Sequence, residues 1–194
     1  MVQTRRFGSE DSQVRTRFLD AAEGILSKGG DHAFSARTIA AEAGLKTQLL
    51  YYYFRTLDEL LLAVIRRVGE RRVTGFENAL ASPEPLRALW ESMADPANAG
   101  LATAITAIAS RNPVVREEIV ESARRFRVLQ TEAVARLLPA TPAGQDPASP
   151  AGLVLIAAAL ARMLVTEQAL GLSQGHAEAR AMVDAMLERL RPPG

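Results

Sequence analysis

The 194-residue sequence predicts an all-α protein, and two observations lead to this fold class. Apolar residues recur at helical spacing along nearly the whole chain, and no segment alternates polar and apolar residues for long enough to form a convincing strand. Gly, Pro and capping residues interrupt this pattern at intervals that suit helices. The composition, 48% hydrophobic and 23% charged, is that of an ordinary globular protein.

The N-terminal region predicts a series of helices. In the first, within "RTRFLDAAEGILSKGG" (15–30), apolar residues share one face and Gly29-Gly30 end the helix. Ser35 can cap a short second helix, "ARTIAAEA", which stops at Gly44. A third short helix runs from about Lys46 to Phe54.

A capping box, Thr56-x-x-Glu59, opens a long fourth helix that reaches about Leu80. After it the chain becomes rich in Ala and Leu, and Pro residues divide it into further helices. The Pro-rich segment 139–150 is predicted to be a loop between two of them. The expected later helices span 84–94, 98–110, 113–138, 151–171 and 175–190.

Several classes of protein and site are disfavoured by the composition. The formal net charge is only +1, and its basic excess lies in the first 75 residues. The chain has no Cys, and its two His, His32 and His176, are far apart in the sequence, so we expect neither a metal site nor a cofactor. The basic start lacks an apolar stretch, and the longest apolar run ends at Arg162, so we expect a cytoplasmic protein without a membrane span.

The stretch 35–54, "SARTIAAEAGLKTQLLYYYF", has the pattern of a helix-turn-helix. Gly44 suits the tight turn, because it lacks a Cβ atom. In the second helix of the pair, Leu50 and Phe54 are four residues apart and share an inward face. The opposite side carries Thr47, Gln48, Tyr51 and Tyr52, with Leu49 at its edge. Such a polar face can enter a DNA groove, where the first residues of the helix reach base edges.

These residues resemble the TetR family of one-component transcriptional regulators. The matching segments are Phe34–Ala40, Ala43-Gly44-Leu45, Tyr51–Phe54 and Asp58-x-Leu60, with Ala21-Ala22 and Gly30 upstream. The resemblance implies a homodimer with a DNA-binding unit of three helices and a helical ligand-binding domain. The chain departs from the family pattern at Lys46, Gln48 and Leu57, where the family often has Ser, Gly and Lys.

Within this pattern each residue has a role expected at DNA. Gln48 and Thr47 are expected to read bases, because Gln can pair with adenine through two hydrogen bonds. Tyr51 and Tyr52 are expected to donate hydroxyl hydrogen bonds to phosphates, which position the helix without reading sequence. The remaining expected DNA contacts are Ser35, Arg37, Thr38, Lys46, Leu49, Tyr53 and Arg55. For Leu49 and Tyr53, packing against the protein core is an equally open interpretation.

The last two helices are more apolar than an intramolecular core requires. Large apolar faces rarely stay exposed in monomers, so the excess predicts a four-helix dimer interface. Arg162 and Glu167, on the first of these helices, are expected either to pair across that interface or to face a ligand pocket. The interface residues predicted are Leu153, Ile156, Leu160, Leu164, Val183, Met186 and Leu190.

A ligand pocket is expected among residues 84–170. Few aromatic residues follow residue 54, so the pocket lining should be mostly aliphatic. We therefore expect an apolar effector rather than a planar aromatic cation that needs an aromatic cage. The lining residues predicted are Trp90, Met93, Ile105, Phe126 and Met163.

The sequence thus predicts a DNA-binding domain at 1–57, with its helix-turn-helix at 35–54, and an effector-binding and dimerisation domain at 58–194. The predicted function is that of a homodimeric repressor, released from a palindromic operator by a small apolar molecule. One alternative is a regulator controlled by a protein partner, or an activator. Another is a helical enzyme or scaffold, although no catalytic cluster follows residue 80.

Overall fold

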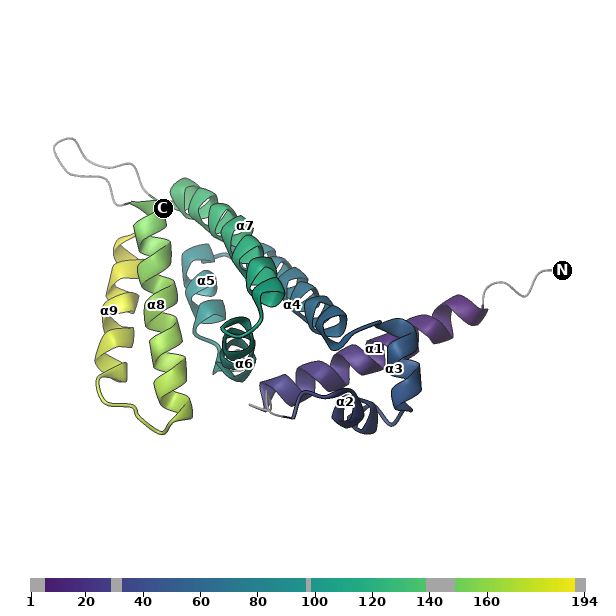
Figure 1. Cartoon of the computed structure of the whole chain (residues 1–194). Coiled ribbons are helices and arrows are strands. Elements are labelled where there is room, and N and C mark those ends of the chain that lie inside the picture. Colours follow the sequence, from purple (N-terminus) through teal and green to yellow (C-terminus); the bar gives the residue numbers. More distant parts are fainter. Residues whose placement is uncertain (1–5, 29–32, 97–98, 139–148, 191–194) are drawn as a thin grey trace. The chain divides into compact units, whose positions relative to one another are not determined.

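The computed structural model describes residues 6–28, 33–96, 99–138 and 149–190, and the predicted end of the first helix at Gly29-Gly30 and the residue His32 lie outside these ranges. The described residues form helices and no strand, which confirms the all-α prediction (Figure 1). The helices are α1 (Arg6–Ser27), α2 (Ala36–Glu42), α3 (Thr47–Tyr53), α4 (Leu57–Leu80), α5 (Pro85–Met93), α6 (Ala99–Ala109), α7 (Pro113–Leu137), α8 (Pro150–Ala169) and α9 (His176–Arg189).

The helices divide into two compact units. The first unit contains residues 1–70 and 100–120, and the second contains 71–99 and 121–194. Helices α4 and α7 therefore each contribute residues to both units. The division between the compact units lies inside α4, between residues 70 and 71, and not at residue 57. The first part of α4 belongs to the first unit because Leu60 and Val64 are fully buried in its core. The functional boundary at residue 57 stays a prediction.

The core of the first unit is built around α1. Phe18 and Leu26 of α1 are fully buried with Ile39 of α2 and Leu50 of α3. Helices of seven residues, such as α2 and α3, have little stability of their own. They are therefore stabilised by packing their apolar side chains into this core. Residues of α6 and the start of α7, such as Ala104 and Val115, complete this core.

Polar contacts fix the first part of α4 within the same unit. Arg67 pairs with Asp20 and Glu23 of α1, at 2.6 Å and 2.7 Å. Arg66 pairs with Glu118 of α7 at 2.6 Å. Surface ion pairs contribute little stability each, but pairs from two helices restrict the direction of α4.

The capping box at the start of α4 is confirmed, with one difference. The Thr56 hydroxyl accepts a hydrogen bond from the Glu59 amide at 3.1 Å. The Glu59 carboxylate accepts from the amide of Arg55 at 2.8 Å, one residue before the capping position. The two bonds satisfy amides that the helix itself leaves unpaired, and they join the end of α3 firmly to α4.

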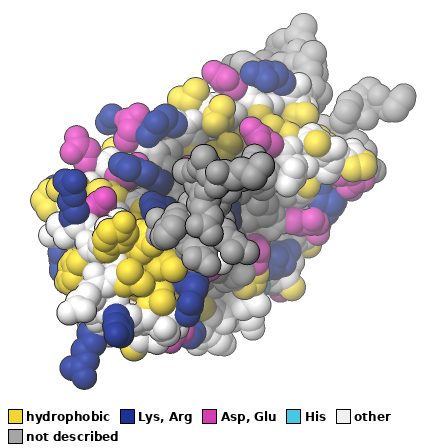
Figure 2. Space-filling view, turned by 90° about the vertical axis from the view of Figure 1, so that its right-hand side faces the viewer, with side chains coloured by type: hydrophobic (Ala, Val, Ile, Leu, Met, Phe, Trp, Pro, Cys, Tyr) yellow, Lys and Arg dark blue, Asp and Glu magenta, His cyan; other side chains and the backbone are white. Residues whose placement is uncertain are grey.

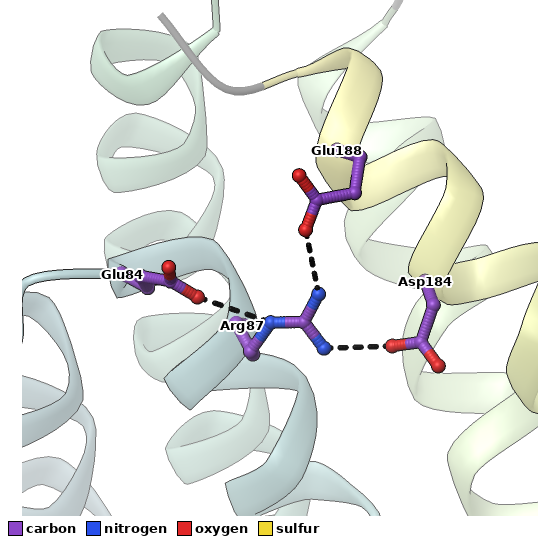
Figure 3. A network of polar contacts seen from close by, with 4 residues as sticks. All are labelled: Glu84, Arg87, Asp184 and Glu188. Carbon is purple, nitrogen blue, oxygen red and sulfur yellow. Dashed lines mark hydrogen bonds and ion pairs between the residues drawn. The ribbon is translucent and has the colours of Figure 1, made fainter. Parts of the chain in front are cut away.

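The second unit contains an antiparallel pair, α8 and α9, packed on α5. Trp90 and Ala94 from α5 and its end are buried with Ala161 and Leu164 of α8, and Val183 of α9 packs on the same cluster. Arg87 of α5 connects to α9 through Asp184 at 2.7 Å and Glu188 at 3.1 Å (Figure 3). Its third partner is Glu84 at 3.1 Å.

The turn between α8 and α9 answers one open question of the sequence. His176 is buried, and its Nε2 lies 2.8 Å from a carboxylate oxygen of Glu167. Glu167 is therefore engaged within its own chain, where it joins α8 to the first residue of α9. Arg162 is exposed, and none of the ion pairs among the described residues includes it.

The sequence analysis expected the apolar run of this region to end at Arg162, but the apolar helix α8 continues past that residue. With 20 residues, it is long and apolar enough to cross a membrane by length and composition alone. Only 22% of its most apolar window is buried in the described structure, so a large part of its apolar surface faces outward. One such helix is weak evidence for a membrane span, and the side of α8 that packs on α5 belongs to a folded core.

Candidate nucleic-acid interface

The turn of the helix-turn-helix is set by Gly44. Its φ of 63° lies in the left-handed region that glycine adopts without strain. The Gly44 amide donates to the Ala41 carbonyl at 3.0 Å, and the Leu45 amide donates to the Ala40 carbonyl at 2.9 Å. These two bonds form a Schellman motif, which ends α2 and directs the chain into α3.

Arg17 supports the same turn from α1. Its Nη2 donates to the Ala43 carbonyl at 2.6 Å, so a cation satisfies a carbonyl at the C-terminal end of α2. The sequence analysis did not single out Arg17, since the contact joins residues far apart in the chain. A Cβ atom at Gly44 would lie 3.3 Å from the same Nη2. Both residues thus fix the angle at which α3 leaves the turn.

Ser35 caps α2 as predicted. Its hydroxyl oxygen accepts a hydrogen bond from the Thr38 amide at 3.2 Å and lies 2.8 Å from the Thr38 hydroxyl oxygen. Each hydroxyl therefore has a structural partner within the chain. Their predicted contacts with DNA stay predictions.

Helix α3 has one buried side and one exposed side. Leu50 is fully buried, and Phe54, which follows the helix, is 1% exposed. Tyr51 is 49% exposed and Tyr52 is 73% exposed, and Gln48 is exposed as well. The inward anchors thus hold α3 on the core, while the other side presents an amide and two phenol rings.

For two residues of α3, Leu49 and Tyr53, the sequence analysis left open a DNA contact or packing on the core, and both contribute to packing. Tyr53 is half-buried, with its ring centroid 6.3 Å from that of Phe18 and 5.0 Å from that of Tyr52. Leu49 is half-buried against the same core, and Thr47 is half-buried at the start of the helix. Tyr53 therefore supports Tyr52 edge-on and links the exposed face to the core.

Cations surround the exposed face of α3. Arg37 on α2, Lys46 before α3 and Arg55 after it are all exposed. Among the ion pairs of the described residues, none involves these three side chains. Figure 2 shows Lys and Arg side chains around apolar side chains on the side where the N-terminal helices lie. Unpaired cations next to a polar helix face suit a polyanion, because each can neutralise one phosphate.

A shallow groove lies between α2 and α3. It is lined by Arg37, Ala40, Ala41, Leu45, Lys46, Thr47 and Gln48. Its rim carries two of the unpaired cations, and Gln48 lies at the exposed start of α3. An amide at such a position can read a base edge directly, and cations at either side can contact the phosphate backbone.

The predicted pocket residues are divided between the two units. Trp90, Met93 and Phe126 belong to the apolar clusters of the second unit. Ile105 packs in the core of the first unit, because α6 contributes side chains to the core that also holds α2 and α3. Met163 is 56% exposed. Of the five predicted lining residues, Trp90, Met93 and Phe126 thus lie in apolar clusters of one unit, and the ligand pocket itself stays a prediction.

The predicted dimer residues are divided in a similar way. Leu164 is 2% exposed and packs with Leu160 and Val183 in the cluster of Trp90, so these side chains face their own chain. Ile156 is 65% exposed and Met186 is 42% exposed. Leu153 and Leu190 are partly buried. Of the predicted interface residues, Ile156 and Met186 are thus exposed in the single chain, and the dimer interface stays a prediction.

Residues 18–64 match the family model described as bacterial regulatory proteins, tetR family. The chain thus shares its N-terminal segment with the TetR family. The match covers α2 and α3 entirely and includes Gly44, the buried anchors and the capping box of α4. The family predicted from the motif is confirmed.

A curated TetR-like relative is the HTH-type transcriptional regulator UidR of Escherichia coli K12. It is 31% identical over 72 residues, which cover 37% of this chain and 37% of the relative. A TetR-family regulator from Rhodococcus sp. has a similar structure, with a TM-score of 0.70, 16% identity, and coverage of 93% of this chain and 100% of that one. A transcriptional regulator from Saccharomonospora viridis in complex with choline gives a TM-score of 0.69 at 21% identity, over 92% of this chain and 94% of the other.

At these low identities the solved structures show that the TetR-type fold extends over both units of this chain. The relatives are transcriptional regulators, which agrees with the prediction of a regulator rather than an enzyme. The family model is matched by residues 18–64, which lie in the first unit.

Proposed function

We propose that this TetR-family chain is a homodimeric transcriptional regulator of the cytoplasm that represses genes by binding a palindromic operator. The observation that carries the proposal is the exposed side of α3. Gln48, Tyr51 and Tyr52 lie on it, opposite the buried Leu50, and unpaired cations lie next to it. In a dimer, two such helices about 34–36 Å apart would enter successive major grooves.

The first prediction separates base reading from phosphate contact. Gln48→Ala should relax the preference at one base pair of each half-site, by roughly 1–3 kcal/mol of discrimination, because the amide that reads a base edge is removed. Tyr51→Phe should weaken binding to all sequences similarly, because it removes one hydroxyl donor to phosphate. Selection of bound DNA from a random pool, followed by affinity measurements at fixed salt, gives both quantities.

Arg136→Ala is the matched control, since this exposed cation lies on α7 in the second unit and pairs with Glu132 at 3.5 Å. It should leave affinity and base preference unchanged. If the unmodified dimer selects no sequence at moderate salt, the proposed function is wrong. If Gln48→Ala keeps the selected sequence intact, Gln48 does not read a base.

The proposed dimer forms through the outward faces of α8 and α9. Leu155 and Met163 on α8, at 58% and 56% exposure, are two turns apart on one stripe, with Ile156 beside it. Met182 and Met186 are one turn apart on α9, at 74% and 42% exposure. Apolar stripes on two adjacent helices favour a four-helix interface with a second copy, in which the same residues meet across a two-fold axis.

The second prediction follows from this interface. Ile156→Glu should weaken dimerisation by about 100-fold or more, roughly 2.7 kcal/mol, since two carboxylates would be buried near the axis. Analytical ultracentrifugation over a range of concentrations measures the monomer–dimer equilibrium. Val114→Glu is the control, because Val114 is 56% exposed on α7 and far from the stripe in sequence. Equal dimerisation by Ile156→Glu and the unmodified chain would contradict this interface.

The second unit is proposed to bind a small-molecule effector with an apolar body, which releases the dimer from DNA. The choline bound by the Saccharomonospora viridis regulator supports a small ligand for a protein of this fold. In this chain, Trp90, Met93 and Phe126 lie in apolar clusters of the second unit. Release requires that the effector bind the DNA-free conformation more tightly than the DNA-bound one.

A further inference from the structure

Three arginines from three helices of the second unit are near enough for the charges of two of them to act on the third. Arg72 is on α4, Arg127 on α7 and Arg162 on α8. The guanidinium carbon of Arg72 lies 4.1 Å from the ring centroid of Phe126, the residue next to Arg127. Burial lowers the pKa of Arg72, and the positive charges of Arg127 and Arg162 lie near enough to lower it further. We call these residues the arginine cluster.

Within the described part of the chain, no carboxylate pairs with the arginine cluster. No ion pair of the described residues includes any of its members, and Nη1 of Arg127 is buried without a hydrogen-bond partner. Two other arginines of the chain contact several carboxylates: Arg87 contacts three, and Arg67 contacts two. The arginine cluster is therefore unlike the ion-pair networks that join helices elsewhere in the chain.

Such an arrangement is costly for the protein alone. A buried donor without a partner costs about 1–3 kcal/mol, and more when it belongs to a charged group. A bound anion would remove this cost, because its oxygens accept hydrogen bonds from guanidinium groups and its charge offsets theirs.

The surroundings of the arginine cluster are apolar. The rings of Phe76 and Phe126 pack edge to face at 5.3 Å, and Met93 contacts both this cluster and that of Trp90. Arg162 directly follows Ala161, which is buried with Trp90. The two apolar clusters thus meet at Met93, Arg72 lies over a ring of one of them, and Arg162 is next in sequence to a residue of the other. An anionic head with an apolar tail matches both features.

We propose that the arginine cluster binds the carboxylate of an organic acid whose aliphatic body enters the seam between the clusters of Phe126 and Trp90. Arg127 and Arg162 donate hydrogen bonds to the carboxylate oxygens, and Arg72 contributes its charge from above Phe126. This proposal rests on the proposed function and specifies its effector: an apolar body alone does not use the arginines, and a cation such as choline is repelled by them.

The place of the arginine cluster also suggests how such a ligand acts on DNA binding. Arg72 and Arg127 lie on α4 and α7, and both helices continue into the first unit. There the two helices are joined by the Arg66–Glu118 pair and by a hydrogen bond from Asn112 to Asp58 at 2.9 Å. A carboxylate that draws Arg72 and Arg127 together therefore acts on the two helices that reach the reading unit.

The test compares three probes that share one aliphatic chain: decanoate, decanol and decyltrimethylammonium. Trp90 is the only Trp of the chain and lies beside the seam, so its fluorescence reports binding without a label. The full-length protein should bind decanoate at least 10-fold more tightly than decanol, and decyltrimethylammonium most weakly. Calorimetric titration provides an independent dissociation constant. Equal affinity for decanoate and decanol, or no binding of decanoate, overturns the proposal.

Variants locate the carboxylate. Arg127→Gln and Arg162→Gln should each weaken decanoate binding at least 10-fold and leave decanol binding unchanged. Arg124→Gln is the matched control, because it removes an exposed cation from the same helix, and it should bind decanoate like the unmodified protein. If Arg127→Gln does not fold, Arg162→Gln decides, since its side chain is exposed. Equal losses in Arg124→Gln and Arg162→Gln overturn the proposal.

DNA binding is measured separately on the selected operator, so that the two proposals fail independently. Release of DNA by decanoate, lost in Arg162→Gln, supports both. Selective binding of decanoate without any effect on DNA affinity supports the anion site and counts against the effector-released repressor. Release of DNA by decanol as readily as by decanoate overturns the carboxylate site and leaves the proposed repressor intact.

Discussion

Replacing Phe54 by Ala is expected to lower the free energy of unfolding of the first unit by about 3–5 kcal/mol. The ring is 1% exposed and belongs to the core that holds α3 on α1. The guanidinium carbon of Arg15 lies 5.0 Å from the ring centroid, and this cation–π contact, about 0.5–1 kcal/mol at an exposed site, is lost as well. Because domains are stable by only about 5–15 kcal/mol, the loss should be evident in urea unfolding followed by circular dichroism.

Tyr52→Ala is the matched control, since it also removes an aromatic ring from the same short stretch. Tyr52 is 73% exposed, so unfolding should change by no more than about 0.5 kcal/mol. The two substitutions should therefore separate: Phe54→Ala loses stability, and Tyr52→Ala loses affinity for DNA. Similar losses of stability in the two variants would contradict the division of α3 into a buried and an exposed side.

The helix-turn-helix of α2 and α3 could be predicted because the sequence patterns that form it are local. Gly44 in a left-handed turn, Ser35 at a helix start, and Leu50 with Phe54 one turn apart each depend on residues a few positions away. The start of α1 could not be predicted in this way. The helix begins at Arg6, well before the first apolar residues that the sequence analysis used, because its first turns carry no apolar periodicity.

The contacts that could not be predicted from the sequence join residues of different helices. They depend on which side of each helix faces its neighbours. Ile105 has the apolar character of a pocket residue, yet α6 places it in the core of the reading unit. Leu164 and Ile156 look alike in the sequence, but only rotation about α8 decides that one is buried and the other exposed. The arginine cluster was missed for the same reason, since no spacing in the sequence relates Arg72, Arg127 and Arg162.

Gly100→Ala is the second substitution with a large expected effect. Gly100 is in the first turn of α6, where a Cβ atom would lie 2.2 Å from the carbonyl oxygen of Ser27, the last residue of α1. This is closer than any relaxed contact, and the obstructing atom belongs to the backbone, so α6 must move away from the end of α1. We expect a loss of about 1–3 kcal/mol in the free energy of unfolding, despite the higher helix propensity of Ala.

Gly75→Ala supplies the control with the opposite sign. Gly75 lies inside α4, and nothing is within 4 Å of the Cβ atom that would be added. Its replacement should stabilise the protein by about 0.4–1 kcal/mol, because Ala loses less conformational entropy on folding. The same chemical change is thus expected to have opposite effects at two helical glycines. The difference between the urea midpoints of the two variants reports the cost of the contact between α6 and the end of α1. A stabilising Gly100→Ala would mean that α6 does not abut the end of α1, and the core of the reading unit would then exclude α6.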